Sequence, residues 1–269
     1  MSAQLHPAAT PCPNCEAPVA GEFCAACGQK RVRADDLSVR RFFDQLADEI
    51  MAFRLNSKTV RSLGGLFAPR QLTEQYLAGR RARFLSPIKI YFLCAAIFFF
   101  AAPWAGFNLA SMLARNPEGE IAKLVDTRRN ELGLPPSVFA ERFDVRVPTV
   151  FTLTLTLGVL AFALALQLLY RGKRLPFGAH LVFAVHYVAV LYLITLATGA
   201  LLQVTPLPQS TAAGLGVILM AVYLAFALAR VYRDPARVTL AKSLLLLIVT
   251  LTFTYLVNYW AIVFTLRLI

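Results

Sequence analysis

Four cysteines near the start of the chain have the spacing of a metal-binding module. They form two Cys-x2-Cys pairs joined by residues 16–23. Each pair can direct two thiolates to the same side of a tight turn. Two such turns complete the tetrahedral sulfur cage that zinc prefers, with bonds of about 2.3 Å. The predicted ligands of a structural Zn²⁺ are Cys12, Cys15, Cys24 and Cys27.

The neighbouring residues favour a short zinc ribbon over 12–30. Pro13 and Asn14 lie inside the first pair, and Gly28 follows the second, where a knuckle needs a residue free to take a positive φ. Disulfides are the alternative, but they belong to oxidising compartments, and the basic stretch that follows places this segment in a reducing cytosol. We interpret Cys94, which lies in an apolar run, as a small buried hydrophobe.

Two histidines lie within a strongly apolar segment. At 1.5 Å per residue, His186 lies roughly 13–14 Å beyond Phe177, near the middle of a bilayer, where an ionisable group suggests a function. The i,i+6 spacing from His180 separates the two rings by about 120° around a helix, which argues against a chelate. His180 instead shares a face with Tyr187. These three residues are candidates for ligand binding; the alternative is that both imidazoles are neutral and bonded to neighbouring helices.

A basic and aromatic stretch runs from Tyr76 to Tyr91. It contains Arg80, Arg81 and Arg83 directly before the apolar part of the chain. The functional interpretation is a site for anionic lipid headgroups or phosphate. The alternative is a basic anchor that obeys the positive-inside rule.

Composition places the chain in the membrane. Its residues are 58% hydrophobic, its mean hydropathy is +0.59 and its formal net charge is +12. Several apolar runs are longer than the roughly 20 residues that a membrane helix needs. We therefore predict a mainly α, polytopic membrane bundle over 87–269. The five expected spans are Ile88–Ala105, Val147–Tyr170, Phe177–Val204, Thr211–Val231 and Val238–Leu266.

Charge sets the expected orientation. The connections after the second and fourth spans are basic, whereas the polar insert at 106–146 carries balanced charges and the 205–210 turn carries none. By the positive-inside rule, the N-terminus and the ribbon lie in the cytoplasm, and the insert and the C-terminus lie in the periplasm. This predicts a multi-pass protein of the bacterial inner membrane.

The segment before the spans is expected to be helical and amphipathic. Residues 1–11 are predicted to be a disordered lead that contains His6. Over 35–86, a first helix begins near Leu37 and a second near Lys58. Such arginine-rich helices lie in the headgroup plane or pack on the ends of a membrane bundle.

Several motifs together resemble a family. They are the Cys-x2-Cys…Cys-x2-Cys-Gly-Gln opening, the Tyr-x2-Gly-Arg-Arg-x2-Phe-x2-Pro stretch from Tyr76, the segment from His180 to His186, and the run Arg230–Tyr232. The chain resembles an uncharacterised bacterial family known only as a domain of unknown function. The resemblance implies a zinc ribbon followed by several membrane helices, and it implies no activity. The family often has an acid and a further histidine where this chain has Ala179 and Val188.

Two functions follow from these patterns. The first is a non-catalytic membrane protein that handles a lipid-like ligand or serves a transport or envelope complex. Its ribbon would dock a protein partner; nucleic acid is not expected, because the ribbon has few aromatic residues to stack on bases. Membrane lipids are expected partners, and an oligomer is compatible with the sequence. The alternative is a membrane-embedded enzyme that acts on a lipid or polyprenyl substrate with His186 and His180. The spans contain no acidic residue and no hydrolase motif, which favours the first function.

Overall fold

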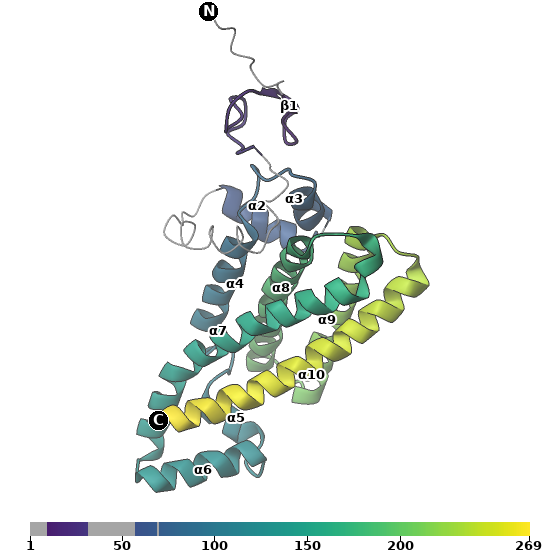
Figure 1. Ribbon diagram of the computed structural model, residues 1–269. Helices are drawn as coiled ribbons and strands as arrows, with labels where there is room; N and C mark the ends of the chain where they lie inside the picture. Colours follow the sequence, from purple (N-terminus) through teal and green to yellow (C-terminus); the bar gives the residue numbers. More distant parts are fainter. Residues whose placement is uncertain (1–9, 32–56, 69) are drawn as a thin grey trace, which may run out of the picture.

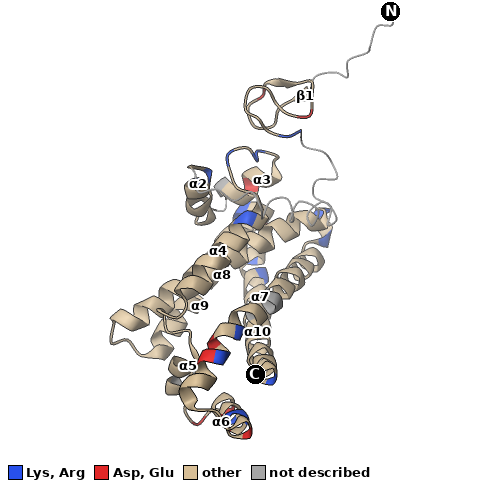
Figure 2. Ribbon diagram, turned by 90° about the vertical axis from the view of Figure 1, so that its left-hand side faces the viewer, with Lys and Arg blue, Asp and Glu red and all other residues tan. Residues whose placement is uncertain are grey.

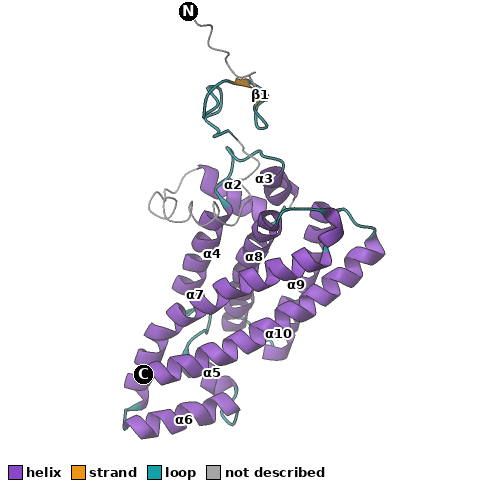
Figure 3. Ribbon diagram, viewed as in Figure 1, coloured by secondary structure: helices purple, strands orange, loops and turns teal. Residues whose placement is uncertain are grey.

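The structure, a computed structural model, describes residues 10–31, 57–68 and 70–269. It is mainly α-helical, as predicted (Figures 1 and 3). A two-stranded antiparallel hairpin, β1 (Thr10–Pro11) and β2 (Pro18–Val19), belongs to the cysteine-containing module, which we call the cysteine module (residues 10–31). The expected first helix near Leu37 lies outside the described residues. The helices are α2 (Ser57–Leu66), α3 (Gln75–Leu77), α4 (Pro87–Ala101), α5 (Leu109–Arg115), α6 (Glu120–Leu132), α7 (Pro136–Leu169), α8 (Phe177–Val204), α9 (Gln209–Tyr232) and α10 (Ala236–Leu268), with a π-helical turn η2 (Arg70–Glu74) and a 3-10 turn η3 (Arg171–Lys173).

Within the described ranges, three helices are long and apolar enough to cross a membrane: α8, α9 and α10. The protein is therefore of a membrane type, while the count of five spans stays a prediction. α4 has 15 residues and is about 22 Å long, less than the ~30 Å hydrocarbon core. α7 begins earlier than the expected second span, and its described apolar part covers only Thr156–Leu169.

Proline and capping residues set where the helices begin. Ser86 caps α4 by accepting from the backbone N–H of Lys89, and Pro87 occupies the first helical position, as the sequence predicted. Pro135, Pro176, Pro208 and Pro235 directly precede the four longest helices, where the fixed φ of proline suits a helix start. The long helices therefore alternate in direction, and the cysteine module and α6 lie at opposite ends of the molecule (Figure 1).

α8 is the centre of the bundle. It packs against α4, α7 and α9, and it is buried from Gly178 to Tyr187. Small residues such as Ala184 and Ala189, both fully buried, let the neighbouring backbones approach closely. The flanking helices α9 and α10 expose large apolar side chains such as Ile218 and Leu244, which suit a hydrocarbon environment.

The insert at 106–146 forms a small helical cap rather than a plain connection. α5, α6 and the first turns of α7 enclose a second apolar core around Val125 and Phe139, which Leu266 of α10 joins. The Asp144 carboxylate accepts from the N–H of Leu109 at 2.9 Å, and burial raises the pKa of this carboxyl group. Arg128 donates to the carbonyl of Leu266 at 3.1 Å, so α6 holds the end of α10.

The segment from α2 to α3 inserts into the end of the bundle that carries the cysteine module. Leu66 and Leu72 are 1% exposed, and the Tyr223 hydroxyl on α9 donates to the Leu66 carbonyl at 2.8 Å. The Ser62 hydroxyl accepts from the N–H of Leu85 and ties the segment to the start of α4. Of the two arrangements expected for the second amphipathic helix, the structure has the one packed on the bundle.

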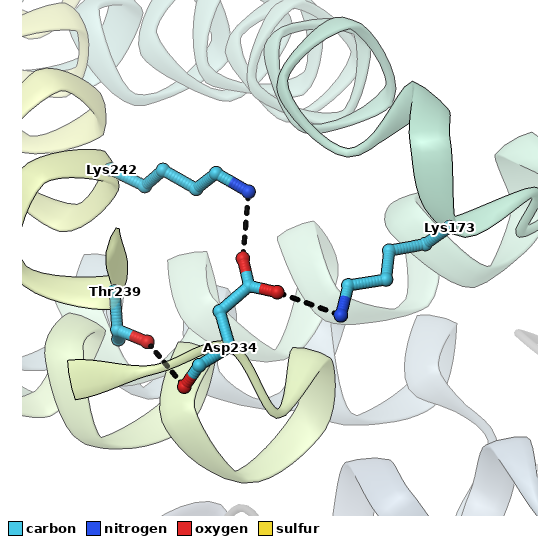
Figure 4. A network of polar contacts seen from close by, with 4 residues as sticks. All are labelled: Lys173, Asp234, Thr239 and Lys242. Carbon is cyan, nitrogen blue, oxygen red and sulfur yellow. Dashed lines mark hydrogen bonds and ion pairs between the residues drawn. The ribbon is translucent and has the colours of Figure 1, made fainter. Parts of the chain in front are cut away.

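One carboxylate joins three elements at this same end. Asp234, in the turn between α9 and α10, pairs with Lys173 of η3 and with Lys242 of α10, each at 2.7 Å, and its side chain is 8% exposed (Figure 4). Hydrogen bonds from Lys173 and then Lys242 hold the pKa of Asp234 below its usual range. Lys242 also lies 4.0 Å from the centre of the Tyr170 ring. Together these contacts fix the ends of α7, α9 and α10.

We expect Asp234→Asn to destabilise the detergent-solubilised protein by about 1–3 kcal/mol, because two lysines lose their shared counter-charge. The pKa of the carboxyl is lowered by folding, so its contribution is complete above about pH 4 and is lost as the pH falls through the lowered folded value. Thermal unfolding between acidic and neutral pH measures both effects. Asp126→Asn, in an exposed pair with Arg129, is the control and should change stability by less than about 0.5 kcal/mol. An equally stable Asp234→Asn protein would contradict the assignment.

Candidate functional site

The four cysteines of the cysteine module come together as ligands. Their sulfur atoms all lie within 4.8 Å of one another, with 3.7 Å from Cys12 to Cys27 and 3.5 Å from Cys15 to Cys24. A tetrahedral ion with sulfur bonds of about 2.3 Å requires neighbouring sulfurs about 3.8 Å apart. These separations exceed a disulfide bond and fit a cage that could hold a metal ion.

Two equivalent turns form this cage. The N–H of Glu16 donates to the Cys12 carbonyl, and the N–H of Gly28 donates to the Cys24 carbonyl, each at 2.8 Å. Gly28 has φ +70°, as its position after the second pair predicted, and Glu16 has φ +64° at the equivalent place. The backbone N–H of Gln29 lowers the pKa of the Cys27 thiol to about 6, which favours the thiolate that a metal ion needs.

Gln29 attaches the cysteine module to the helical part of the protein. Its side-chain nitrogen donates to the Gly79 carbonyl at 2.8 Å, and its side-chain oxygen accepts from the N–H groups of Arg81 and Ala82 at 2.9 and 3.0 Å. The residue is 5% exposed. One side chain therefore satisfies three backbone groups of the turn before α4. Sequence reasoning quoted Gln29 in a motif but gave it no role.

The candidate arginines lie around this turn. Arg80 and Arg83 are exposed, and the Arg81 guanidinium lies 4.8 Å from the centre of the Tyr76 ring. Figure 2 places many Lys and Arg residues at this end of the helices and both signs of charge on α6. The Tyr76 ring meets His186 edge-on at 6.5 Å, so Arg81 and His186 are connected through one aromatic ring.

The two membrane histidines are separate and enclosed. His186 is 1% exposed, which confirms that it faces the protein interior, and its Nδ1 lies 2.8 Å from the Thr73 hydroxyl of η2. The partner expected on the second or fifth span was wrong, because the segment before α4 reaches into the bundle. His180 is buried, and its Nδ1 lies 2.7 Å from the Tyr232 hydroxyl at the end of α9.

Tyr187 lies elsewhere, at the wall of a cavity of about 510 Å³. The cavity lies between α7, α8, α9 and α10 and is mostly lined by apolar side chains such as Leu191 and Val217. Its described lining includes neither histidine and no arginine. The structure thus divides the candidate residues among three places: the cysteine module with the arginines, the enclosed histidines, and the cavity with Tyr187.

Comparison with known proteins gives one family. Residues 57–99 match the family model described as "Protein of unknown function (DUF3667)". The match covers α2, η2, α3 and most of α4, the part of the chain that contacts both the cysteine module and His186. No curated protein and no solved structure matches the chain.

We expect the purified protein to contain one metal ion per chain and Cys24→Ser to lose it, since three sulfurs leave the tetrahedral set incomplete. Elemental analysis measures the content and identifies the ion. Cys94→Ala removes the buried cysteine of α4 and is the control that should keep the metal. A full equivalent of metal in Cys24→Ser would refute the site.

We expect Gln29→Ala to keep the metal but release the cysteine module from the turn at 79–82. Hydrogen exchange of the Arg81 and Ala82 amides should rise about tenfold or more, because each lost hydrogen bond contributes about 1 kcal/mol. Lys30→Ala, at the exposed neighbour that pairs with Glu22, should leave exchange unchanged. Unchanged exchange in Gln29→Ala would show that the other contacts hold the module.

Proposed function

We propose that this protein is a multi-pass membrane protein that binds a lipid hydrocarbon chain in its bundle, with a structural zinc ribbon attached to one end. The observation that carries the proposal is the cavity of about 510 Å³ between α7, α8, α9 and α10. Its volume lies in the range of sites for small molecules, and its lining is mostly apolar.

The position of the cavity supports a lipid as its occupant. It adjoins α9 and α10, whose outer faces expose apolar side chains including Val222 and Ile248. These helices meet hydrocarbon when they cross a membrane, so a lipid chain can reach the cavity without passing through water. A polar metabolite would find few partners there.

Charge supports the proposed orientation. The end that carries the cysteine module also carries Arg171, Arg174, Arg230 and Arg237, which suits the cytoplasmic face of an inner membrane. Arg80 and Arg83 are exposed at the same end and would contact anionic headgroups. The cap formed by α5 and α6 would then lie on the opposite face.

Zinc is the proposed metal, because four thiolates in a tetrahedral arrangement form its usual structural site. Such a site holds a small module together and carries no reaction. Phe23, 59% exposed on the cysteine module, offers an apolar contact for a protein partner. The enzyme alternative depended on histidines and arginines that line a cavity, and the described cavity has Tyr187 in their place.

We expect Val217→Trp to reduce the lipid that copurifies with the protein at least about tenfold, because the larger ring fills the cavity. Mass spectrometry of extracts from the monodisperse protein measures the retained lipid. Ile218→Trp makes the same change one residue along α9, on a side chain 60% exposed, and should retain the wild-type amount. Equal retention in both variants would contradict the proposal.

A further inference from the structure

We infer that the lipid in the cavity is neutral and carries a hydroxyl group, which binds between Tyr187 and Thr250. This inference rests on the proposed function, since it names the chemical class of the same ligand. It is drawn from an unpaired hydroxyl group on the cavity wall, from the hydrogen-bonding capacity of its neighbour and from the charge of the lining.

Tyr187 presents a hydroxyl group without a partner. The residue is 1% exposed, and its hydroxyl is buried with no hydrogen-bond partner among the described residues. The ring lies against Phe162 and Tyr223, with centroid separations of 4.9 and 6.2 Å, so it cannot turn to seek a partner elsewhere. Because Tyr187 lines the cavity, a bound molecule can supply the missing hydrogen bond.

Thr250 of α10 also lines the cavity and neighbours the Tyr187 hydroxyl. Its hydroxyl donates to the Leu246 carbonyl at 2.8 Å, so towards the cavity its oxygen can only accept. A ligand hydroxyl can accept from Tyr187 and donate to Thr250 at once. A carbonyl oxygen could only accept, and an alkane could do neither. The pair therefore favours an alcohol.

The lining also selects against charge. Among the described lining residues there is no Asp, Glu, Lys, Arg or His. A carboxylate or phosphate inside the cavity would have no counter-charge in a region of low dielectric. The lining runs along α8 from Tyr187 to Leu202, roughly 22 Å, against about 15 Å for one leaflet. A long hydrocarbon chain can thus extend from a hydroxyl group held at Tyr187.

The test compares hexadecanol, hexadecane and hexadecanoate, each radiolabelled and presented to the full-length protein in nanodiscs of neutral phospholipid. We expect hexadecanol to bind about tenfold more tightly than either of the others at neutral pH, as two added hydrogen bonds allow. In Tyr187→Phe, which removes only the hydroxyl, the preference should fall to about threefold or less. Tyr255→Phe, the same change at a side chain 72% exposed on α10, should keep the full preference.

The outcomes separate the two proposals. If the probes bind, and Val217→Trp blocks them, but Tyr187→Phe keeps the full preference for hexadecanol, the hydroxyl site is refuted while the lipid cavity stands. Equal or tighter binding of hexadecane or hexadecanoate to the wild-type protein likewise refutes the neutral alcohol. If no probe binds to the wild-type protein above the level of Val217→Trp, the proposed function itself fails.

Discussion

The hydrogen bond between Thr73 and His186 determines how the whole cysteine-module end of the protein is built. Hydrocarbon offers no partner to an imidazole, so a histidine this far along α8 must be satisfied by the protein itself. Its partner comes from η2, which carries backbone and side chains into the bundle between α8 and α9. A π-helical turn is rare, and here it occurs where the chain must place Leu72 and Thr73 in the core.

A continuous series of contacts leads from this hydrogen bond to the metal cage. Tyr76, one turn after Thr73, packs edge-on against His186 and under Arg81. The N–H of Arg81 donates to Gln29, which follows the last cysteine by two residues. The cage thus fixes the backbone of Gln29, and Gln29 fixes the turn that leads into α4. This gives a structural reason for the two sequence motifs to occur together in one chain.

The sequence predicted those features that depend on local chemistry. The limits of α8 were predicted correctly, because Pro176 precedes the apolar run and Thr205 with its following proline ends it. The cysteine cage and the positive φ of Gly28 also follow from spacing and residue type. Features that depend on tertiary packing did not follow. The expected second span missed the long polar start of α7, since no turn signal separates Arg146 from the apolar residues after it.

The same distinction holds within the candidate site. Sequence reasoning selected Tyr187 only because it shares a helix face with His180, yet the structure places it at a cavity that arises from how α7 and α10 cross α8. Asp234 is the only acid in its loop, which was a usable signal for a buried ion pair, but its contact with Lys173 depends on the ends of α7 and α9 lying together. Crossing angles between helices are set by side-chain packing along their full length and are not encoded in short motifs.

The contact of Arg128 with Leu266 bears on the order in which the protein is assembled. The two residues are separated by 138 positions, and α10 packs along α7 and the α6 cap, all of which leave the ribosome earlier. α10 can therefore dock onto a surface that already exists. Because α10 also supplies Thr250 to the cavity, the pocket is complete only after that docking. A lipid could enter the partly built bundle from the side and be enclosed as α10 arrives, so the protein would acquire its ligand during biogenesis.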